Sequence, residues 1–168
     1  LTAENIRLKE ALSLYKVSEA IASSLSLDGV MGTVSDAAVH EIDADAVTIL
    51  LDDGEGGFFE RAREINPHFR GDGEFGELDP KALHDYFSED RLLRVHGSEG
   101  LPFFSVVPVG LSLQSLMVTT LRIRNKTIGY LGAMSFTRGK RFVEGQRKLL
   151  SIVASRTLNG EVIRLDGA

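Results

Sequence analysis

Residues 115–136 read SLMVTTLRIRNKTIGYLGAMSF and carry the clearest secondary-structure pattern in the chain. They hold two apolar runs with many β-branched residues, which favour strands, and the runs meet at Arg124-Asn125-Lys126. A short polar turn between two such runs predicts a β-hairpin. The second run ends at Phe136, and apolar spacing typical of a helix begins near Phe142. We therefore predict a hairpin that leads into a long C-terminal helix.

Upstream of this hairpin, apolar spacing predicts two helices, over residues 5–25 and residues 27–42. The dense apolar run at residues 46–51 predicts a buried strand. Residues 58–65 predict its hairpin partner across a glycine-rich turn, because glycine tolerates the positive φ angles of tight turns. The first part of the chain therefore reads as two helices followed by a second hairpin.

The middle of the chain combines loops with short elements. Residues 66–78 are rich in glycine and predict a loop. Asp79 followed by Pro80 is typical of a helix start, with Asp as the N-cap and Pro at the first helical position. A short strand is predicted at residues 92–95. Two prolines within residues 101–113 exclude a central strand position for that segment.

Helices and hairpins in this order, with no dividing linker, predict one α+β domain over residues 1–168. The sheet is expected to be antiparallel, with five or six strands and the N- and C-terminal helices on one face. The chain carries a net charge of −5, which argues against a nucleic-acid partner, since such surfaces are usually basic. No apolar run approaches the roughly 20 residues that cross a bilayer.

The chain contains no cysteine, which excludes disulfides, thiolate metal sites and cysteine nucleophiles. A chain without cysteine fits a cytoplasmic protein, and we expect that location. The acidic runs around Asp52-Asp53 and residues 74–79 lie among glycines, where solvated turn residues are the favoured interpretation. No nucleophile or acid–base pair is suggested by the sequence, so we expect no enzymatic activity. We also expect no metal site.

Four segments together resemble the GAF domain, a sensory and signalling module related to PAS domains. They are LYKVSEAIASSLSLDGV at residues 14–30, ADAVTILLDD at residues 44–53, RNKTIGYLGAMSF at residues 124–136 and RFVEGQRKLLSIVA at residues 141–154. The resemblance implies a GAF-like sheet with a short helix and loops over a pocket on the face opposite the terminal helices. Residues 66–113 carry no diagnostic motif.

Several motifs that assign a ligand in the GAF family are absent from this chain. The Asn-Lys-Phe-Asp-Glu motif of its cyclic-nucleotide-binding members is missing, and the absence of cysteine excludes a covalently attached bilin. His84 lies on the short helix that, by resemblance, lines the pocket. Some family members hold haem through a histidine in this region, but one histidine without a second ligand predicts a surface position, and we expect no cofactor.

Six residues are the predicted pocket wall, since ligand pockets are mostly apolar with a few polar groups. They are Tyr86, Phe103, Phe104, Arg122, Tyr130 and Met134. Arg122 alternates with the apolar Leu121 and Ile123, so it faces away from them and could pair with an anionic ligand. The alternative for each apolar member of the set is a plain core position.

The two terminal helices each show a second apolar stripe, which predicts contact with a partner as well as with the sheet. The predicted dimer contacts are Leu14, Val17, Ile21, Ala154, Leu158 and Val162, in a bundle formed by residues 1–25 and 143–165. If the last helix ends at Asn159-Gly160, its second stripe disappears.

The resulting hypothesis is a sensory domain that binds an unknown small molecule, forms a homodimer, and signals through its terminal helices to an output domain in the same parent chain. The alternative is a ligand-free structural or dimerisation module.

Overall fold

The computed structural model describes residues 32–88, 92–123 and 126–167, with the side chains of the last helix described as far as Ser155. Residues 32–42 are helical, in agreement with the second predicted helix. The predicted helix at residues 5–25 lies outside the described residues. So do the predicted dimer contacts Leu14, Val17 and Ile21, and Arg124-Asn125 at the hairpin turn.

Five antiparallel strands form the main sheet in the order β2-β1-β7-β6-β4. Their bounds are Ala46–Asp52 for β1, Phe58–Ile65 for β2, Leu92–His96 for β4, Ser115–Ile123 for β6 and Lys126–Ser135 for β7. The sheet confirms the predicted α+β class with five antiparallel strands. It also confirms both hairpins, β1–β2 and β6–β7.

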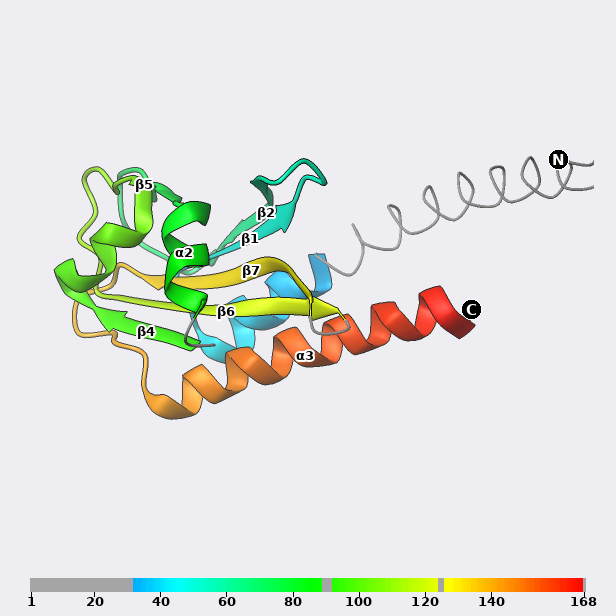
Figure 1. Ribbon diagram of the computed structural model, residues 1–168. Helices are drawn as coiled ribbons and strands as arrows, with labels where there is room; N and C mark the ends of the chain where they lie inside the picture. Colours follow the sequence, from blue (N-terminus) through cyan, green and yellow to red (C-terminus); the bar gives the residue numbers. More distant parts are fainter. Residues whose placement is uncertain (1–31, 89–91, 124–125, 168) are drawn as a thin grey trace, which may run out of the picture.

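The sheet has different layers on its two faces (Figure 1). Helix α3, Glu144–Gly167, and the helix at residues 32–42 cover one face. Helix α2, Pro80–Phe87, covers the other, together with a 3₁₀ helix at Gly97–Phe103 and a small second sheet of β3, Glu77–Leu78, and β5, Phe104–Val106. The middle of the chain, residues 77–88 and 97–106, therefore forms a separate layer on this face of the sheet.

Strand β1 is buried on both faces, which explains why residues 46–51 are apolar except for Thr48, whose hydroxyl donates to Glu60 Oε2 at 2.8 Å. Val47, Ile49 and Leu51 pack under α3, whereas Ala46 and Leu50 pack toward α2. Successive side chains of a strand point to opposite faces, so a strand covered on both sides is apolar at most of its positions.

Helix α2 begins as its sequence predicts. The Asp79 side chain accepts a hydrogen bond from the Lys81 backbone N–H at 3.0 Å, and Pro80 occupies the first turn. Leu83 and Phe87, one turn apart, are both buried against the sheet. The cap and the apolar spacing thus fix where α2 starts and which face it buries.

Helix α3 differs from its predicted division into two opposite stripes. Val153 and Ala154 are adjacent and both pack in the core under the sheet, where Ala154 is 3% exposed. Neighbouring helical residues lie about 100° apart, so a wide apolar face includes both. Ala154 is therefore not free to contact a partner. The backbone stays helical through Asn159 and Gly160, and the side chains of Leu158 and Val162 lie outside the described residues.

A pair of Gly→Ala substitutions tests the packing between β1 and β7. A Cβ atom at Gly129 would lie 2.1 Å from the backbone oxygen of Leu50, so Gly129→Ala forces the two strands apart. We expect its free energy of unfolding, measured by urea titration followed by circular dichroism, to fall by about 3 kcal/mol.

Gly145→Ala is the matched control, because a Cβ atom there meets nothing within 4 Å and alanine favours a helix more than glycine does. The free energy of unfolding of Gly145→Ala should rise by up to about 1 kcal/mol. Equal losses in the two variants would contradict the packing described here.

Candidate functional site

Five of the six predicted pocket residues lie together on the α2 face of the sheet. The Tyr86 and Phe103 rings meet edge to face with centroids 5.5 Å apart, and Phe87 stacks on Tyr130 at 5.6 Å. Phe104 and Met134 are buried in the same cluster, and Tyr130 is 1% exposed. The cluster is tightly packed, which suits a core as well as a pocket wall. The ligand-contact role of these residues stays a prediction.

Arg122, the sixth predicted residue, lies near this cluster. Burial raises the pKa of the Tyr130 phenol, and the positive charge of Arg122 partly offsets that effect. The Nε atom of Arg122 is buried and has no hydrogen-bond partner among the residues that the structure describes. A buried donor without an acceptor is costly, so Arg122 remains a candidate contact for an anion.

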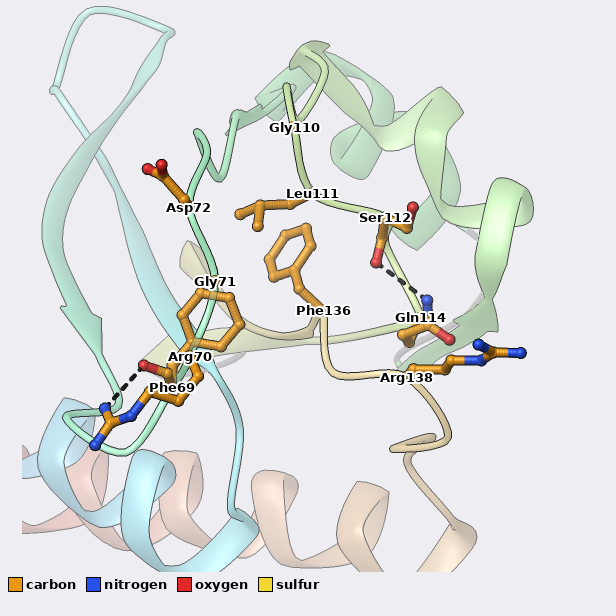
Figure 2. Close-up of a pocket in the computed structure, with 10 residues that line it drawn as sticks. All are labelled: Phe69, Arg70, Gly71, Asp72, Gly110, Leu111, Ser112, Gln114, Phe136 and Arg138. Carbon is orange, nitrogen blue, oxygen red and sulfur yellow. Dashed lines mark hydrogen bonds between the residues drawn. The ribbon is translucent and has the colours of Figure 1, made fainter.

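A separate pocket of about 490 Å³ lies at the end of the sheet where β7 finishes (Figure 2). Its apolar lining comes from Phe69, Leu111 and Phe136, and its polar rim includes Arg70, Asp72, Ser112, Gln114 and Arg138. Gly71 and Gly110 complete it. None of the six predicted residues lines this pocket. Its volume is in the range of about 300–1,000 Å³ that small-molecule sites occupy.

Two loops far apart in sequence build the pocket, one after β2 and one before β6. Glu74 and Val109 join them by a pair of backbone hydrogen bonds of 2.7 and 3.0 Å. Gly110 has φ +76°, a conformation that favours glycine, and a Cβ atom there would lie 3.2 Å from the Asp72 backbone oxygen of the other loop. Rigidly joined loops at the edge of a scaffold are a common location for binding sites.

The polar side chains on the rim differ in how many hydrogen bonds they make within the protein. Arg70 Nη1 donates to the carbonyl oxygens of Pro67 and Phe69 at 3.2 and 3.3 Å, and Gln114 Nε2 donates to the Ser112 carbonyl at 3.2 Å. Arg138 is exposed and makes no hydrogen bond or ion pair with any residue that the structure describes. Its guanidinium group is therefore available to a ligand.

Phe136 and Arg138 belong to the connector, residues 136–143, which leads from β7 into α3. The Asp45 carboxylate, 2% exposed, holds this connector at its start. Its Oδ2 accepts from the Phe136 N–H at 2.7 Å and from the Thr137 N–H and hydroxyl at 2.9 Å each. Its Oδ1 pairs with Lys140 Nζ at 3.1 Å. These bonds offset the cost of burying the charge.

The far end of the connector is held from β4 and β6. Ser115 Oγ accepts from the Phe142 N–H at 3.2 Å, and Arg94 Nη1 donates to the Phe142 carbonyl at 3.1 Å. His96 lies 2.9 Å from Ser115 Oγ through Nδ1 and 3.2 Å from Arg94 Nη1 through Nε2. The pocket wall and the first turn of α3 are thus parts of one hydrogen-bonded segment.

His96 is shifted toward its neutral form. Burial disfavours the imidazolium, and the charges of Arg94 and Arg141 repel it, so the pKa of His96 lies below the ordinary value of 6.5. A neutral ring can accept from Arg94 through Nε2, whereas a protonated ring cannot. Protonation would therefore disturb the two groups that hold Phe142.

The described residues supply no metal-binding group. Among them, no three His, Cys, Asp or Glu side chains gather closely enough to hold a metal ion. His84 is exposed on α2. No helix within the described ranges is both long and apolar enough to cross a membrane.

The sequence contained little sign of this site. Asp45 stands immediately before the mainly apolar strand β1, and an acidic residue at such a border is the one local signal of this site. The pocket residues lie in segments predicted as loops without a motif, because their partner loops are distant in sequence.

Solved GAF-domain structures resemble this arrangement. The GAF domain of PixJ from Thermosynechococcus elongatus, in its blue-light absorbing form, has a TM-score of 0.62 at 10% identity and covers 83% of this chain and 87% of that chain. The GAF domain/HD domain protein from Geobacter sulfurreducens has a TM-score of 0.59 at 10% identity, covering 84% and 96%. The chain has the GAF fold.

A further GAF structure, the GAF-B domain of DevS from Mycobacterium smegmatis, has a TM-score of 0.56 at 14% identity and covers 81% of this chain and 93% of that chain. No protein-family model and no curated protein matches the chain. At identities this low the similarity establishes the GAF fold, and the ligand has to be argued from this chain's own residues.

The Asp45 contacts are tested by Asp45→Asn, which keeps the size of the side chain and removes its charge. We expect the free energy of unfolding to fall by about 2–3 kcal/mol, the range for hydrogen bonds to a charged group. Urea titration measures the loss, and faster hydrogen exchange at the Phe136 and Thr137 amides localises it.

Asp43→Asn is the matched control, because Asp43 pairs with the same lysine at 3.3 Å but its side chain is 71% exposed. That change should cost less than about 1 kcal/mol. A similar loss in both variants would mean that the buried hydrogen bonds of Asp45 contribute little.

The lowered pKa of His96 predicts a pH dependence of stability. A histidine whose pKa is lowered by folding contributes stability that is fully present above the unfolded pKa and is lost as the pH falls through the folded value. We expect the free energy of unfolding to drop more between about pH 7 and pH 5 in the wild type than in His96→Gln. Identical slopes in the wild type and His96→Gln would refute the effect.

Proposed function

We propose that this chain is a non-catalytic sensory module that binds a small molecule in the pocket beside Phe136 and passes its occupancy to α3. One observation supports this most directly: Phe136 and Arg138 line the pocket and also belong to the connector that starts α3. The GAF fold supports it too, since PixJ, a structural neighbour, is a cyanobacteriochrome receptor.

The relay would act through the two ends of the connector. A ligand that contacts Phe136 or Arg138 changes the balance between arrangements of this segment only if it binds one arrangement better than the other. Asp45 holds the connector beside the pocket, and Ser115 and Arg94 hold it at Phe142. A shift at one end therefore reaches the first turn of α3 within eight residues, 136–143.

Helix α3 is the proposed output element. It continues as a helix to Gly167, beyond the sheet (Figure 1). Ile152 on its outer side is 51% exposed, which leaves an apolar residue for a partner. We propose that two copies pair through α3 and the N-terminal segment as a homodimer in the cytoplasm, and that α3 leads to an output domain of a larger signalling protein.

Native mass spectrometry of the chain purified from its own host tests the sensory role, followed by hydrogen exchange with and without the small-molecule fraction of that host. We expect a bound small molecule and slower exchange at residues 136–150 when it is present. Light scattering across a dilution series checks the dimer in the same samples, and a monomer at high micromolar concentration would contradict it.

The opposite result would favour the ligand-free structural module. In that case native mass spectrometry would detect no bound small molecule, and hydrogen exchange at residues 136–150 would be the same in buffer and in the host extract. A dimer without any ligand response would identify dimerisation as the role of the chain.

A further inference from the structure

We infer that the pocket beside Phe136 takes an organic anion with a flat apolar body, such as an aromatic carboxylate or phosphate ester. This inference rests on the proposed ligand-binding function and adds the chemical class of the ligand. Three features carry it: an aromatic floor, a rim with unpaired positive charge, and a volume too large for a bare inorganic anion.

The floor of the pocket is aromatic. Two rings of the lining, Phe69 and Phe136, form it. Phe75 lies outside the lining and packs against both, with ring centroids 5.4 Å from Phe69 and 5.3 Å from Phe136, so the three rings form one row. Gly71 allows this row to close against the facing loop, because a Cβ atom there would lie 2.5 Å from Phe69 Cζ and 3.2 Å from Leu111 Cδ2. A flat apolar group suits such a floor, since aromatic rings pack in offset or edge-to-face contacts.

The rim is positively charged, although the whole chain carries a net charge of −5. The lining holds two arginines, Arg70 and Arg138, and one acidic residue, Asp72. Figure 2 shows the Asp72 carboxylate and the Arg70 guanidinium both directed away from the hollow, so the positive charge available to a ligand is that of Arg138. Asp43 and Asp45, which lie beside the connector, are already paired with Lys140 at 3.3 and 3.1 Å. Neither of these two acids is therefore free to neutralise Arg138.

Arg138 and Gln114 together form the expected site of the anionic head. Both residues line the pocket, and Figure 2 draws them on the same side of it. The Gln114 amide donates one hydrogen bond to the Ser112 carbonyl and keeps a second N–H for a ligand. A guanidinium beside an amide offers several donors to the two oxygens of a carboxylate, and charge-assisted hydrogen bonds of this kind are among the strongest in proteins.

The size of the pocket favours a large organic anion over a small inorganic one. At about 490 Å³, the pocket would leave an inorganic phosphate or sulfate surrounded by water. A ligand of the size of a substituted aromatic ring system fills it and covers the floor of phenylalanines. The ligand class is therefore an anion attached to an apolar body.

A pair of probes that differ only in charge tests this class. We would titrate ¹⁵N-labelled protein with 1-naphthoate and with 1-naphthamide and follow the backbone amides by NMR. We expect both probes to shift the amides of Gly71, Leu111 and Phe136, with naphthoate binding about tenfold more tightly, the gain of one charge-assisted contact.

Substitution of Arg138 tests whether its guanidinium group binds the anionic group of the probe. Arg138→Gln should weaken naphthoate binding about tenfold and leave naphthamide binding unchanged. Arg141→Gln is the matched control, because Arg141 is exposed on the same connector and does not line the pocket. It should leave both affinities unchanged.

Three results would overturn the inference. They are equal affinity for the two probes, equal effects of Arg138→Gln and Arg141→Gln, and shifts confined to the cluster around Tyr130. The proposed sensory function fails separately, when a ligand of any charge binds the pocket and hydrogen exchange at residues 136–150 does not change.

Discussion

A single buried carboxylate, that of Asp45, joins the start of β1, the end of β7 and the connector to α3. Its side chain accepts hydrogen bonds from Phe136 and Thr137 and forms an ion pair with Lys140. Its backbone carbonyl accepts from the Asn66 N–H at 2.8 Å, at the start of the loop that forms one wall of the pocket. A charge buried to this extent requires all its partners, so the positions of pocket and helix are fixed together.

The two faces of the sheet have different roles. The face under α3 is packed with aliphatic side chains and Phe142, and Gln146 of α3 also donates to the Ile42 carbonyl at 2.9 Å. The opposite face carries α2, the small second sheet and the loops that build the pocket. Strands β1 and β7 lie in the middle and are buried on both sides. A rigid central pair of strands lets the loops vary without loss of the core.

Local signals in the sequence were enough to predict the elements on which this frame is built. The Asp79-Pro80 pair marks the start of α2, and the alternation along residues 115–136 marks the second hairpin. Helical angles alone place Ala154 on the side of α3 opposite Val153, but both residues are buried against the sheet. The buried face of α3 is therefore wider than one stripe. Periodicity locates an apolar stripe but does not give its width, which depends on what packs against it.

Local sequence patterns were sufficient to predict the helix at residues 32–42, helices α2 and α3, and the two hairpins in their order, because hydrophobic period, caps and turns are properties of neighbouring residues. The pocket beside Phe136, by contrast, exists only in the folded chain. Phe69, Leu111 and Phe136 come from three separate segments, and the Glu74–Val109 bridge and the Asp45 carboxylate bring those segments together. Contacts of this kind depend on chain topology, and no local pattern encodes them.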